Sequence, residues 1–348
     1  MDLFQFCREL PKVELHAHLN GSLSKSTMLL LKRLNADSGI KDETNTFMDE
    51  FVMGAGDTRS LSDCFQIFSI AHALTTTPQA LQMATSLTLR EFQDDGCCYI
   101  ELRSTPRDTP HMNKNQYVDA IVKGIKNPEN LIISRLIISI NRTMVTAECD
   151  AITDLAIEYH KKYPDIVVGI ELSGNPIVGE FQNFLPALTR ARDAGLKVSL
   201  HCGEVRNPKE VLDMINFKPE RLGHGVCIHP KFGGTQETWQ ALCNSLIPVE
   251  LCLTSNVNTK SVSGYESHHF KELYEAGIPV IINTDDKGVF ATSLSQEYML
   301  CAETFHLEKE QIARLALSAC QYIFDTECRD TVKTKVLEFM NKHYICSY

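Results

Sequence analysis

The stretch VVGIELSGNPIVGEFQNFLPALTRARDAGLKVSLHCGE, residues 167–204, indicates how the chain folds. It begins with a β-rich run at Val167–Gly174 and ends with another at Lys197–Glu204. Between them, Gly179–Ala194 has apolar residues at helical spacing and stops at Gly195, a residue typical of helix ends. A strand, a helix and a second strand in this order predict two parallel strands joined by a helical crossover.

The same alternation continues along all 348 residues. Eight β-rich runs can be recognised, at Lys12–Leu19, Cys98–Pro106, Arg135–Arg142, Val167–Gly174, Lys197–Glu204, Arg221–Gly225, Pro248–Asn256 and Pro279–Asp286. Most gaps between them have helix-like sequence, so the predicted fold class is α/β. Eight such units favour a TIM (β/α)8 barrel over an open doubly wound sheet. No GxGxxG motif follows the first strand, so a dinucleotide-binding fold gains no support.

The chain is longer than the ~250 residues that such a barrel needs. The segment after the first strand, about residues 21–96, is too long for a simple strand–helix unit and is expected to be a helical insertion. Extra C-terminal helices are expected at Leu307–Phe324 and Asp330–His343. Because no linker rich in Pro, Gly or Ser divides the chain, we expect a single barrel domain over residues 1–348.

The composition bounds the class of protein and its partners. With 43% hydrophobic and 22% charged residues, the chain is neither disordered nor collagenous. The net charge of −10 argues against a nucleic acid polymer or an anionic membrane as partner, although a basic pocket could still bind a small anion. The 13 cysteines form no CxxC pair, and residues 1–10 do not resemble a signal peptide, so we expect a cytoplasmic (cytosolic) protein with reduced thiols. We also expect a monomer.

In a parallel barrel, functional side chains lie at the C-terminal ends of the strands. The first strand ends with His16 and His18, which are two residues apart and therefore face the same side of the strand. An HxH pair alone is a weak signal, because two structural histidines would give it too. However, His201 ends the fifth strand and Asp285 follows the eighth, and burying these groups together is costly unless a cation compensates them. Three histidines and one aspartate suit one Zn²⁺ per subunit, which would lower the pKa of a bound water towards ~7 and supply a hydroxide nucleophile.

Three further polar residues at strand ends fit roles beside such a metal. Glu204 can deliver or remove a proton, and His224 can orient the bound water. Strand alternation predicts that Asp286 points away from Asp285, so that one ligates while the other meets substrate. The alternative is structural: a salt-bridged Glu204, a core His224 and a helix-capping Asp286. Their joint occurrence, each at the end of its own strand, favours catalysis.

Four motifs in this order, HAHLNGS, HCGE, LGHG and NTDD, resemble those of the adenosine/AMP deaminase family of zinc-dependent barrel enzymes. The match extends from Leu10 to about Glu297. The resemblance implies that the zinc ligands are His16, His18, His201 and Asp285. It also implies that Glu204 is the proton donor, that His224 orients the water, that Asp286 contacts the base, and that the backbone of Gly174 contacts the purine.

Departures from the adenosine deaminases themselves resemble the N6-methyl-AMP deaminase (adenosine deaminase-like) subgroup. Asn20 stands where those enzymes have an Asp near the ribose 5′ side, and Lys287 stands where they have Pro. ELRSTPR at 101–107 and LTSNV at 253–257 also fit the subgroup. The implied reaction is hydrolysis at purine C6, which converts N6-methyl-AMP and water into IMP and methylamine.

A phosphate at the 5′ position agrees with these substitutions. Two unit charges about 4 Å apart interact by roughly 4 kcal/mol at an effective dielectric of about 20, so a carboxylate at position 20 would repel it. Arg107 or Lys287 could supply positive charge at the rim, whereas Arg103 is expected to form an interior salt bridge. His72 is placed near the substrate by the subgroup pattern, but it lies on an apolar stripe and could equally be core. The expected substrate contacts are His18, Asn20, His72, Ser104, Thr105, Pro106, Arg107, Gly174 and Asp286.

Other functions stay open at this point. The nearest is an adenosine deaminase that acts on free adenosine or 2′-deoxyadenosine. Another is an amide or phosphoester hydrolase with two metals bridged by a carboxylated lysine, but the fourth strand, Val167–Gly174, contains no lysine. A third, of a different class, is a non-catalytic zinc-binding scaffold, against which Glu204 and His224 argue. The zinc site of the other deaminase design needs a PCxxC motif, which is absent from the sequence.

Overall fold

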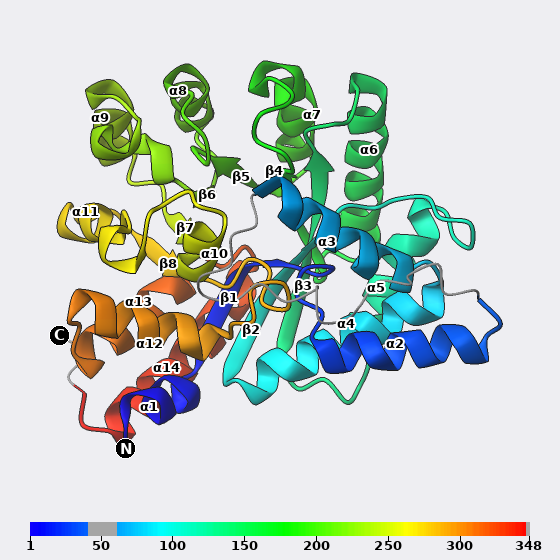
Figure 1. Ribbon diagram of the computed structural model, residues 1–348, viewed down its shortest axis with the longest axis horizontal. Coiled ribbons are helices and arrows are strands. Elements are labelled where there is room, and N and C mark those ends of the chain that lie inside the picture. The colour runs from blue at the N-terminus through cyan, green and yellow to red at the C-terminus, as the bar shows by residue number, and fades with distance from the viewer. Residues whose placement is uncertain (41–60, 346–348) are drawn as a thin grey trace.

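The computed structural model describes residues 1–40 and 61–345, and for residues 61–67 it describes the backbone alone. Its centre is one sheet of eight strands in sequence order, each parallel to the next (Figure 1). The strands are β1 (Lys12–His18), β2 (Cys97–Ser104), β3 (Ile133–Asn141), β4 (Val167–Ser173), β5 (Lys197–Cys202), β6 (Arg221–His224), β7 (Val249–Leu251) and β8 (Val280–Ile282). The sheet closes where Ala17 of β1 forms a parallel bridge with Asp285, just beyond β8. The predicted TIM (β/α)8 barrel is confirmed.

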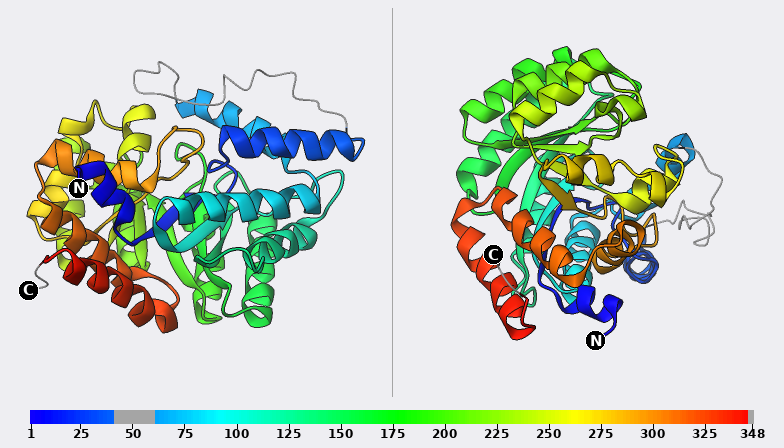
Figure 2. Two further views of the ribbon diagram at one scale, coloured as in Figure 1. Left: turned by 90° about the horizontal axis from the view of Figure 1, so that it is seen from below. Right: turned by 90° about the vertical axis from the view of Figure 1, so that its left-hand side faces the viewer.

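Helices surround this sheet on the outside, as the views in Figure 2 show. Those that follow successive strands and pack around the barrel are α4 (Pro78–Asp94), α5 (Lys114–Ile125), α6 (Thr146–Lys162), α7 (Phe181–Asp193), α8 (Pro208–Phe217), α9 (Gln236–Ser245), α11 (Phe270–Glu275) and α13 (Lys309–Ala319). The others are α1 (Leu3–Glu9), α2 (Lys25–Asp37), α3 (Leu61–Leu74), α10 (Leu253–Asn258), α12 (Leu294–Phe305) and α14 (Arg329–Lys342). No helix in the described ranges is both long and apolar enough to cross a lipid bilayer.

The segment between β1 and β2 combines a barrel helix with added ones. α4 packs against β2 and lies beside α5, so it is the crossover helix of the first unit. α2 packs against both α3 and α4 on the outside of the barrel (Figure 1). Among the described residues of the segment expected as an insertion, α2 and α3 are therefore the helices that a minimal barrel would lack.

The seventh strand is shorter than predicted, because the β-rich run Pro248–Asn256 contains both a strand and a helix. β7 ends at Leu251, and α10 begins at Leu253. The side chain of Glu297 caps the first turn of α10, because the amide of Thr254 donates to one of its carboxylate oxygens at 3.0 Å. The prediction of a strand over residues 253–256 is therefore wrong, and Ser255 and Asn256 approach the barrel mouth from a helix.

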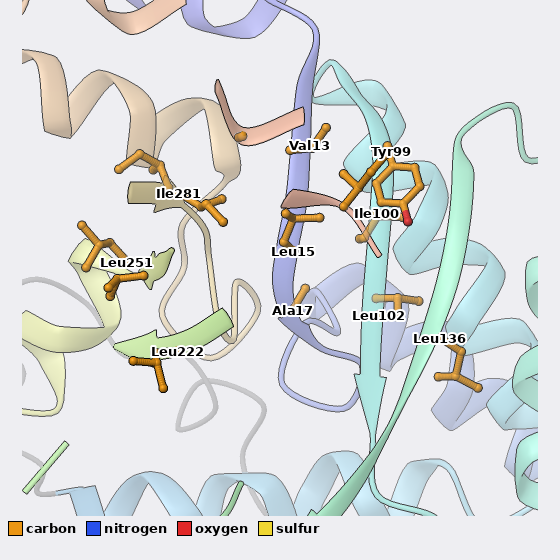
Figure 3. Packing of buried hydrophobic residues seen from close by; sticks show 14 of the residues in the cluster. Val13, Leu15, Ala17, Tyr99, Ile100, Leu102, Leu136, Leu222, Leu251 and Ile281 are labelled. Atoms are coloured by element: carbon orange, nitrogen blue, oxygen red, sulfur yellow. The ribbon is translucent and has the colours of Figure 1, made fainter. Parts of the chain in front are cut away.

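Side chains of the strands alternate between an apolar outer layer and a polar interior. On β1, Val13, Leu15 and Ala17 belong to the main hydrophobic cluster together with Tyr99 and Leu102 of β2 (Figure 3). The intervening side chains of β1, Glu14 and His16 among them, are fully buried as well, although they are polar.

Buried ion pairs lie in the interior of the barrel. The two terminal nitrogens of Arg103 lie 2.6 Å from Glu171 and 2.5 Å from Glu250. Arg221 pairs with Glu250 at 2.5 Å and with Glu101 at 2.6 Å, and none of these five side chains is exposed. The expected interior salt bridge of Arg103 is thus confirmed. Removing one partner of such a buried pair leaves an uncompensated charge, which typically costs about 3–5 kcal/mol.

Candidate active site

A cavity of about 540 Å³ lies at the C-terminal ends of the strands. All but one of the site residues predicted from the sequence line it, namely His18, Asn20, His72, Ser104, Thr105, Pro106, Arg107, Gly174, His201, Glu204, His224, Asp285 and Asp286. The exception is His16, which is fully buried and whose ring packs against those of His18 and His201. One cavity therefore brings together residues that are spread over most of the chain.

A cluster of possible metal ligands forms the floor of the cavity. His16, His18, His201 and Asp285 each offer one ligand atom, and these atoms lie within 4.8 Å of one another. Asp285 Oδ1 is 3.3 Å from His16 Nε2 and 3.4 Å from His18 Nε2. His18 Nε2 is 3.1 Å from His201 Nε2. Zinc bonds of 2.0–2.2 Å in tetrahedral geometry place neighbouring ligand atoms roughly 3.4 Å apart, so this spacing fits one zinc ion.

The chemistry of the four groups also fits a cation. Within the described part of the chain, the buried His16 Nε2 has no hydrogen-bond partner. Burial lowers the pKa of His18 and of His201, which keeps their ring nitrogens available as neutral ligands. Burial and Arg103 also oppose a charge on His16, but the nearby carboxylates of Asp285 and Glu250 outweigh them and raise the pKa of His16 to about 9. The two carboxylates thus attract a positive charge at the place where a metal ion would bind.

Other residues hold the cluster in this arrangement. The Nδ1–H of His16 donates to Glu250 at 2.8 Å, which directs Nε2 towards Asp285. Ser255 of α10 donates its hydroxyl hydrogen to Asp285 Oδ2 at 2.7 Å. The backbone of Asp285 also needs support from its surroundings. Its φ is 61°, a left-handed conformation that costs a non-glycine residue about 1–3 kcal/mol.

Glu204 lies beside this cluster, beyond the end of β5, with Oε1 3.8 Å from His224 Nε2. Burial, and then the charge of Asp285, raise the pKa of Glu204 to about 8. Burial lowers the pKa of His224 to about 3. At neutral pH the carboxyl therefore carries a proton while the imidazole is neutral, the arrangement that a general acid and a hydrogen-bonding histidine require.

Asp285 and Asp286 both line the cavity, so the prediction that strand alternation points them in opposite directions is wrong. Alternation no longer applies because β8 ends at Ile282. Burial, and then the neighbouring Asp285, raise the pKa of Asp286 well above its ordinary value. Gly21 makes room for this side chain, because a Cβ at Gly21 would lie 1.7 Å from Asp286 Oδ1.

Gly174 presents its backbone to the cavity in a conformation that favours glycine. Its φ is 103°, and an added Cβ would lie 2.7 Å from Oδ1 of Asn141. A side chain there would therefore both strain the backbone and clash with the cavity wall.

The rim of the cavity joins β2 to the added helix α3. Arg107 donates to the carbonyl of His72 at 2.8 Å and to the hydroxyl of Thr75 at 3.0 Å. Its other terminal nitrogen is buried and has no hydrogen-bond partner among the described residues. The amide of Asn20 also donates to the Thr75 hydroxyl, and the hydroxyl of Tyr117 donates to Asn20. The His72 side chain is exposed, which contradicts the alternative that it belongs to the core.

The second cation at the rim is not the one considered from the sequence. Lys287 forms an ion pair with Glu91 of α4 and does not line the cavity, so its expected place at the rim is wrong. Lys114, the first residue of α5, lines the cavity instead, with Nζ 3.3 Å from a carboxylate oxygen of Asp108. Lys114 was not predicted from the sequence, because it lies at the start of a helix and not at the end of a strand.

Sequence reasoning also missed residues that support the site without forming a strand-end motif. These are Glu250, Ser255, Asn256, His268 and His269. The signals were a buried acid in the seventh strand, the LTSNV run and two consecutive histidines, none of which indicates its partner without the fold.

Comparison with known proteins gives consistent matches. Residues 11–342 match the adenosine deaminase family. The N6-methyl-AMP deaminase of Bos taurus is 42% identical over 345 residues, covering 97% of each chain. The apo structure of the N6-methyl-AMP deaminase from Arabidopsis thaliana superimposes with a TM-score of 0.86 at 38% identity, covering 98% of this chain and 100% of that one. The structure of the Arabidopsis protein ADAL complexed with GMP gives the same TM-score and identity, with 96% and 98% of the two chains covered.

Proposed function

Because the chain belongs to the adenosine deaminase family, we propose that it is a zinc-dependent hydrolytic deaminase of N6-substituted purine nucleoside monophosphates. Its proposed reaction converts N6-methyl-AMP and water into IMP and methylamine. The observation that carries the proposal is one cavity with a His/Asp cluster at its floor and two cations, Arg107 and Lys114, at its rim. The names of the relatives and the nucleotide bound by the Arabidopsis protein support the same substrate class.

The metal proposed for the floor is one zinc ion, held by His16, His18, His201 and Asp285. When bound, zinc supplies a Lewis acid that lowers the pKa of water towards ~7. Three imidazoles and one carboxylate suit this ion better than magnesium or calcium, which prefer oxygen ligands.

The residues around the cluster then divide the proton transfers. Burial raises the pKa of Glu204 to about 8, which favours its protonated form, and Glu204 would give its proton to purine N1 as water adds to C6. His224 and Asp286 would hydrogen-bond the group forming at C6, and the backbone of Gly174 would contact the purine. The proton of the hydroxyl added at C6 would pass to the substituent nitrogen, and the C6–N bond would break to release methylamine and leave the C6 carbonyl of IMP.

The rim is proposed to bind the 5′-phosphate. The unpartnered terminal nitrogen of Arg107 is a donor that the described residues leave free for an anion. Lys114 adds a second positive charge, while Asn20 stays neutral and avoids the repulsion that a carboxylate would cause. His72, Ser104, Thr105 and Pro106 would complete the wall around the nucleotide.

A product assay tests the proposed reaction. Purified protein with measured zinc content is incubated with N6-methyl-AMP, and IMP and methylamine are quantified. We expect both products in equal amounts, and we expect Glu204→Gln to keep its zinc while kcat falls by about 10²–10⁴-fold, because the general acid is lost. Absence of turnover in zinc-loaded protein would favour a non-catalytic scaffold, and activity at full rate in Glu204→Gln would remove Glu204 from the mechanism.

A further inference from the structure

We propose that Asn256 and His268 fix the tautomer of His224, so that its Nε2 carries the ring hydrogen and donates it into the cavity. The two residues would be positioning residues, because both act through His224, although Asn256 also lines the cavity. The inference refines the role of His224 and rests on the proposed function for its catalytic consequence, although the tautomer itself can be measured without substrate.

The chain of hydrogen bonds begins at a backbone amide. The N–H of Phe270, the first residue of α11, donates to Nδ1 of His268 at 3.0 Å. An amide N–H can only donate, so this ring nitrogen holds a lone pair and no hydrogen. The ring of His268 must therefore carry its hydrogen on Nε2.

The side chain of Asn256 links the ring of His268 to the ring of His224. Nε2 of His268 lies 3.1 Å from Oδ1 of Asn256, an oxygen that accepts. The other end of the Asn256 amide is then the NH₂ group, which lies 3.2 Å from Nδ1 of His224 and must donate to it. Nδ1 of His224 thus accepts a hydrogen bond, and its ring hydrogen is on Nε2.

Burial leaves these three side chains no easy alternative. Asn256 and His268 are each 1% exposed and His224 is 3% exposed, so solvent does not compete for their polar atoms. Reversing the Asn256 amide would place its NH₂ group against the Nε2–H of His268, two donors facing each other, which costs about 1–3 kcal/mol for a buried group left unsatisfied.

His269 holds the backbone of the same residue. Its Nε2 lies 2.7 Å from the carbonyl oxygen of His224, which accepts, and its ring stacks on that of His268 with centroids 4.3 Å apart. His224 has φ of 60°, a left-handed conformation that needs such support. The consecutive histidines therefore fix both the backbone and, through Asn256, the ring hydrogen of His224.

The consequence concerns the cavity side of the ring. Nε2 of His224 lies 3.8 Å from Glu204 Oε1 and 4.0 Å from Asp285 Oδ2, so it faces the reaction centre without being hydrogen-bonded to either. With a hydrogen on Nε2 this nitrogen can donate to an attacking oxygen but has no lone pair with which to remove a proton. This relay, the chain of hydrogen bonds from Phe270 through His268 and Asn256 to His224, assigns His224 the role of a hydrogen-bond donor. Proton transfer is left to Glu204.

A direct test reads the tautomer by nuclear magnetic resonance. Correlation spectra of the ¹⁵N-labelled histidine rings in the zinc-loaded protein distinguish protonated from unprotonated ring nitrogens, and the His224→Gln variant identifies the signals of His224. We expect a hydrogen on Nε2 in the wild type. In Asn256→Asp, a carboxylate can only accept from His224, so the hydrogen should move to Nδ1. A hydrogen on Nδ1 in the wild type overturns the proposal whether or not the protein deaminates nucleotides.

Kinetics of a matched pair separate positioning from mere packing. His268→Gln keeps an N–H donor for Asn256, whereas His268→Met has similar length and no donor. We expect kcat of His268→Gln to stay within about threefold of the wild type and that of His268→Met to fall by tenfold or more, with zinc content and KM little changed. In Asn256→Asp we expect a loss of about 10²-fold or more in kcat, since a wrong histidine tautomer is costly in other hydrolases. Equal losses in His268→Gln and His268→Met would contradict the relay, and this pair still decides if Asn256→Asp fails to fold.

Discussion

Neighbouring side chains in this cavity differ in charge because their contacts differ. Burial raises the pKa of Asp285, but His16 and the other surrounding histidines outweigh it and hold that pKa well below its ordinary value. At Asp286, burial and then the neighbouring Asp285 raise the pKa instead. One carboxylate is thus prepared to ligate a cation, while the other takes up a proton and can meet a substrate.

Replacing Asp285 tests the proposed metal site. In Asp285→Ala the cluster loses its one anionic ligand, so we expect bound zinc and deaminase activity to be lost together. Elemental analysis of the purified variant, alongside its kcat, measures both. Asp286→Asn is the control, because it changes the adjacent carboxyl and should keep the zinc. Activity of Asp285→Ala at the wild-type rate without metal would rule out the zinc mechanism.

Replacing Arg107 tests the phosphate site. A charge-assisted hydrogen bond contributes about 1.5–3 kcal/mol, so Arg107→Ala should raise KM for N6-methyl-AMP by about 10–100-fold. KM for N6-methyladenosine, which has no phosphate, should change much less. Lys287→Ala is the matched control, since Lys287 is paired with Glu91 away from the cavity. An unchanged KM for the monophosphate in Arg107→Ala would show that its role was assigned wrongly.

At the level of elements, the eight β-rich runs of the sequence correspond to the eight strands, because β-rich runs alternating with helical periodicity leave few other arrangements. The ligand set was also predictable, since strand ends of a parallel barrel meet at one rim. Features that depend on local backbone conformation could not be predicted from the sequence. Alternation misplaced Asp286, and the apolar run after Val249 did not reveal that α10 would carry Ser255 and Asn256 to the site. The partners of Arg107 are His72 of α3 and Thr75 just beyond that helix, which no strand motif indicates.

An ion pair between β3 and the C-terminal segment is expected to make the stability of the folded protein decrease at acid pH. Arg135 of β3 lies 2.6 Å from Asp325. Burial alone would raise the pKa of Asp325, but hydrogen bonds from Cys328 and Arg135 outweigh it and lower that pKa. A lowered folded-state pKa stabilises the protein above the unfolded-state value of about 3.9, and this stability is lost as the pH falls below about 4.

Chemical denaturation at two pH values measures this contribution. Because the pair is partly exposed, we expect Asp325→Asn to cost about 1 kcal/mol at pH 7 and less at pH 3. Glu310→Gln, which removes an exposed pair with Arg314, is the control and should cost less at either pH. A loss in Asp325→Asn that is the same at both pH values would contradict the assignment.

For the whole molecule, a net charge of −10 does not exclude an anionic substrate, because a small anion is bound by the few groups that contact it. Arg107 and Lys114 line the cavity rim where the phosphate is proposed to bind, and position 20 is neutral. The absence of a nucleic acid polymer among the partners stays a prediction from the net charge. The monomeric state, the single-domain organisation and the cytosolic location stay predictions from the sequence.

The central claim is that the cavity recognises both the N6 substituent and the 5′-phosphate of one substrate. The most direct measurement is kcat/KM of the zinc-loaded protein for N6-methyl-AMP, AMP, N6-methyladenosine and adenosine, which vary the two groups independently. We expect N6-methyl-AMP to be the best substrate and each monophosphate to exceed its nucleoside by about 10²-fold, as loss of two charged contacts implies. A kcat/KM for free adenosine that equals or exceeds that for N6-methyl-AMP would contradict the proposed function and identify a nucleoside deaminase instead.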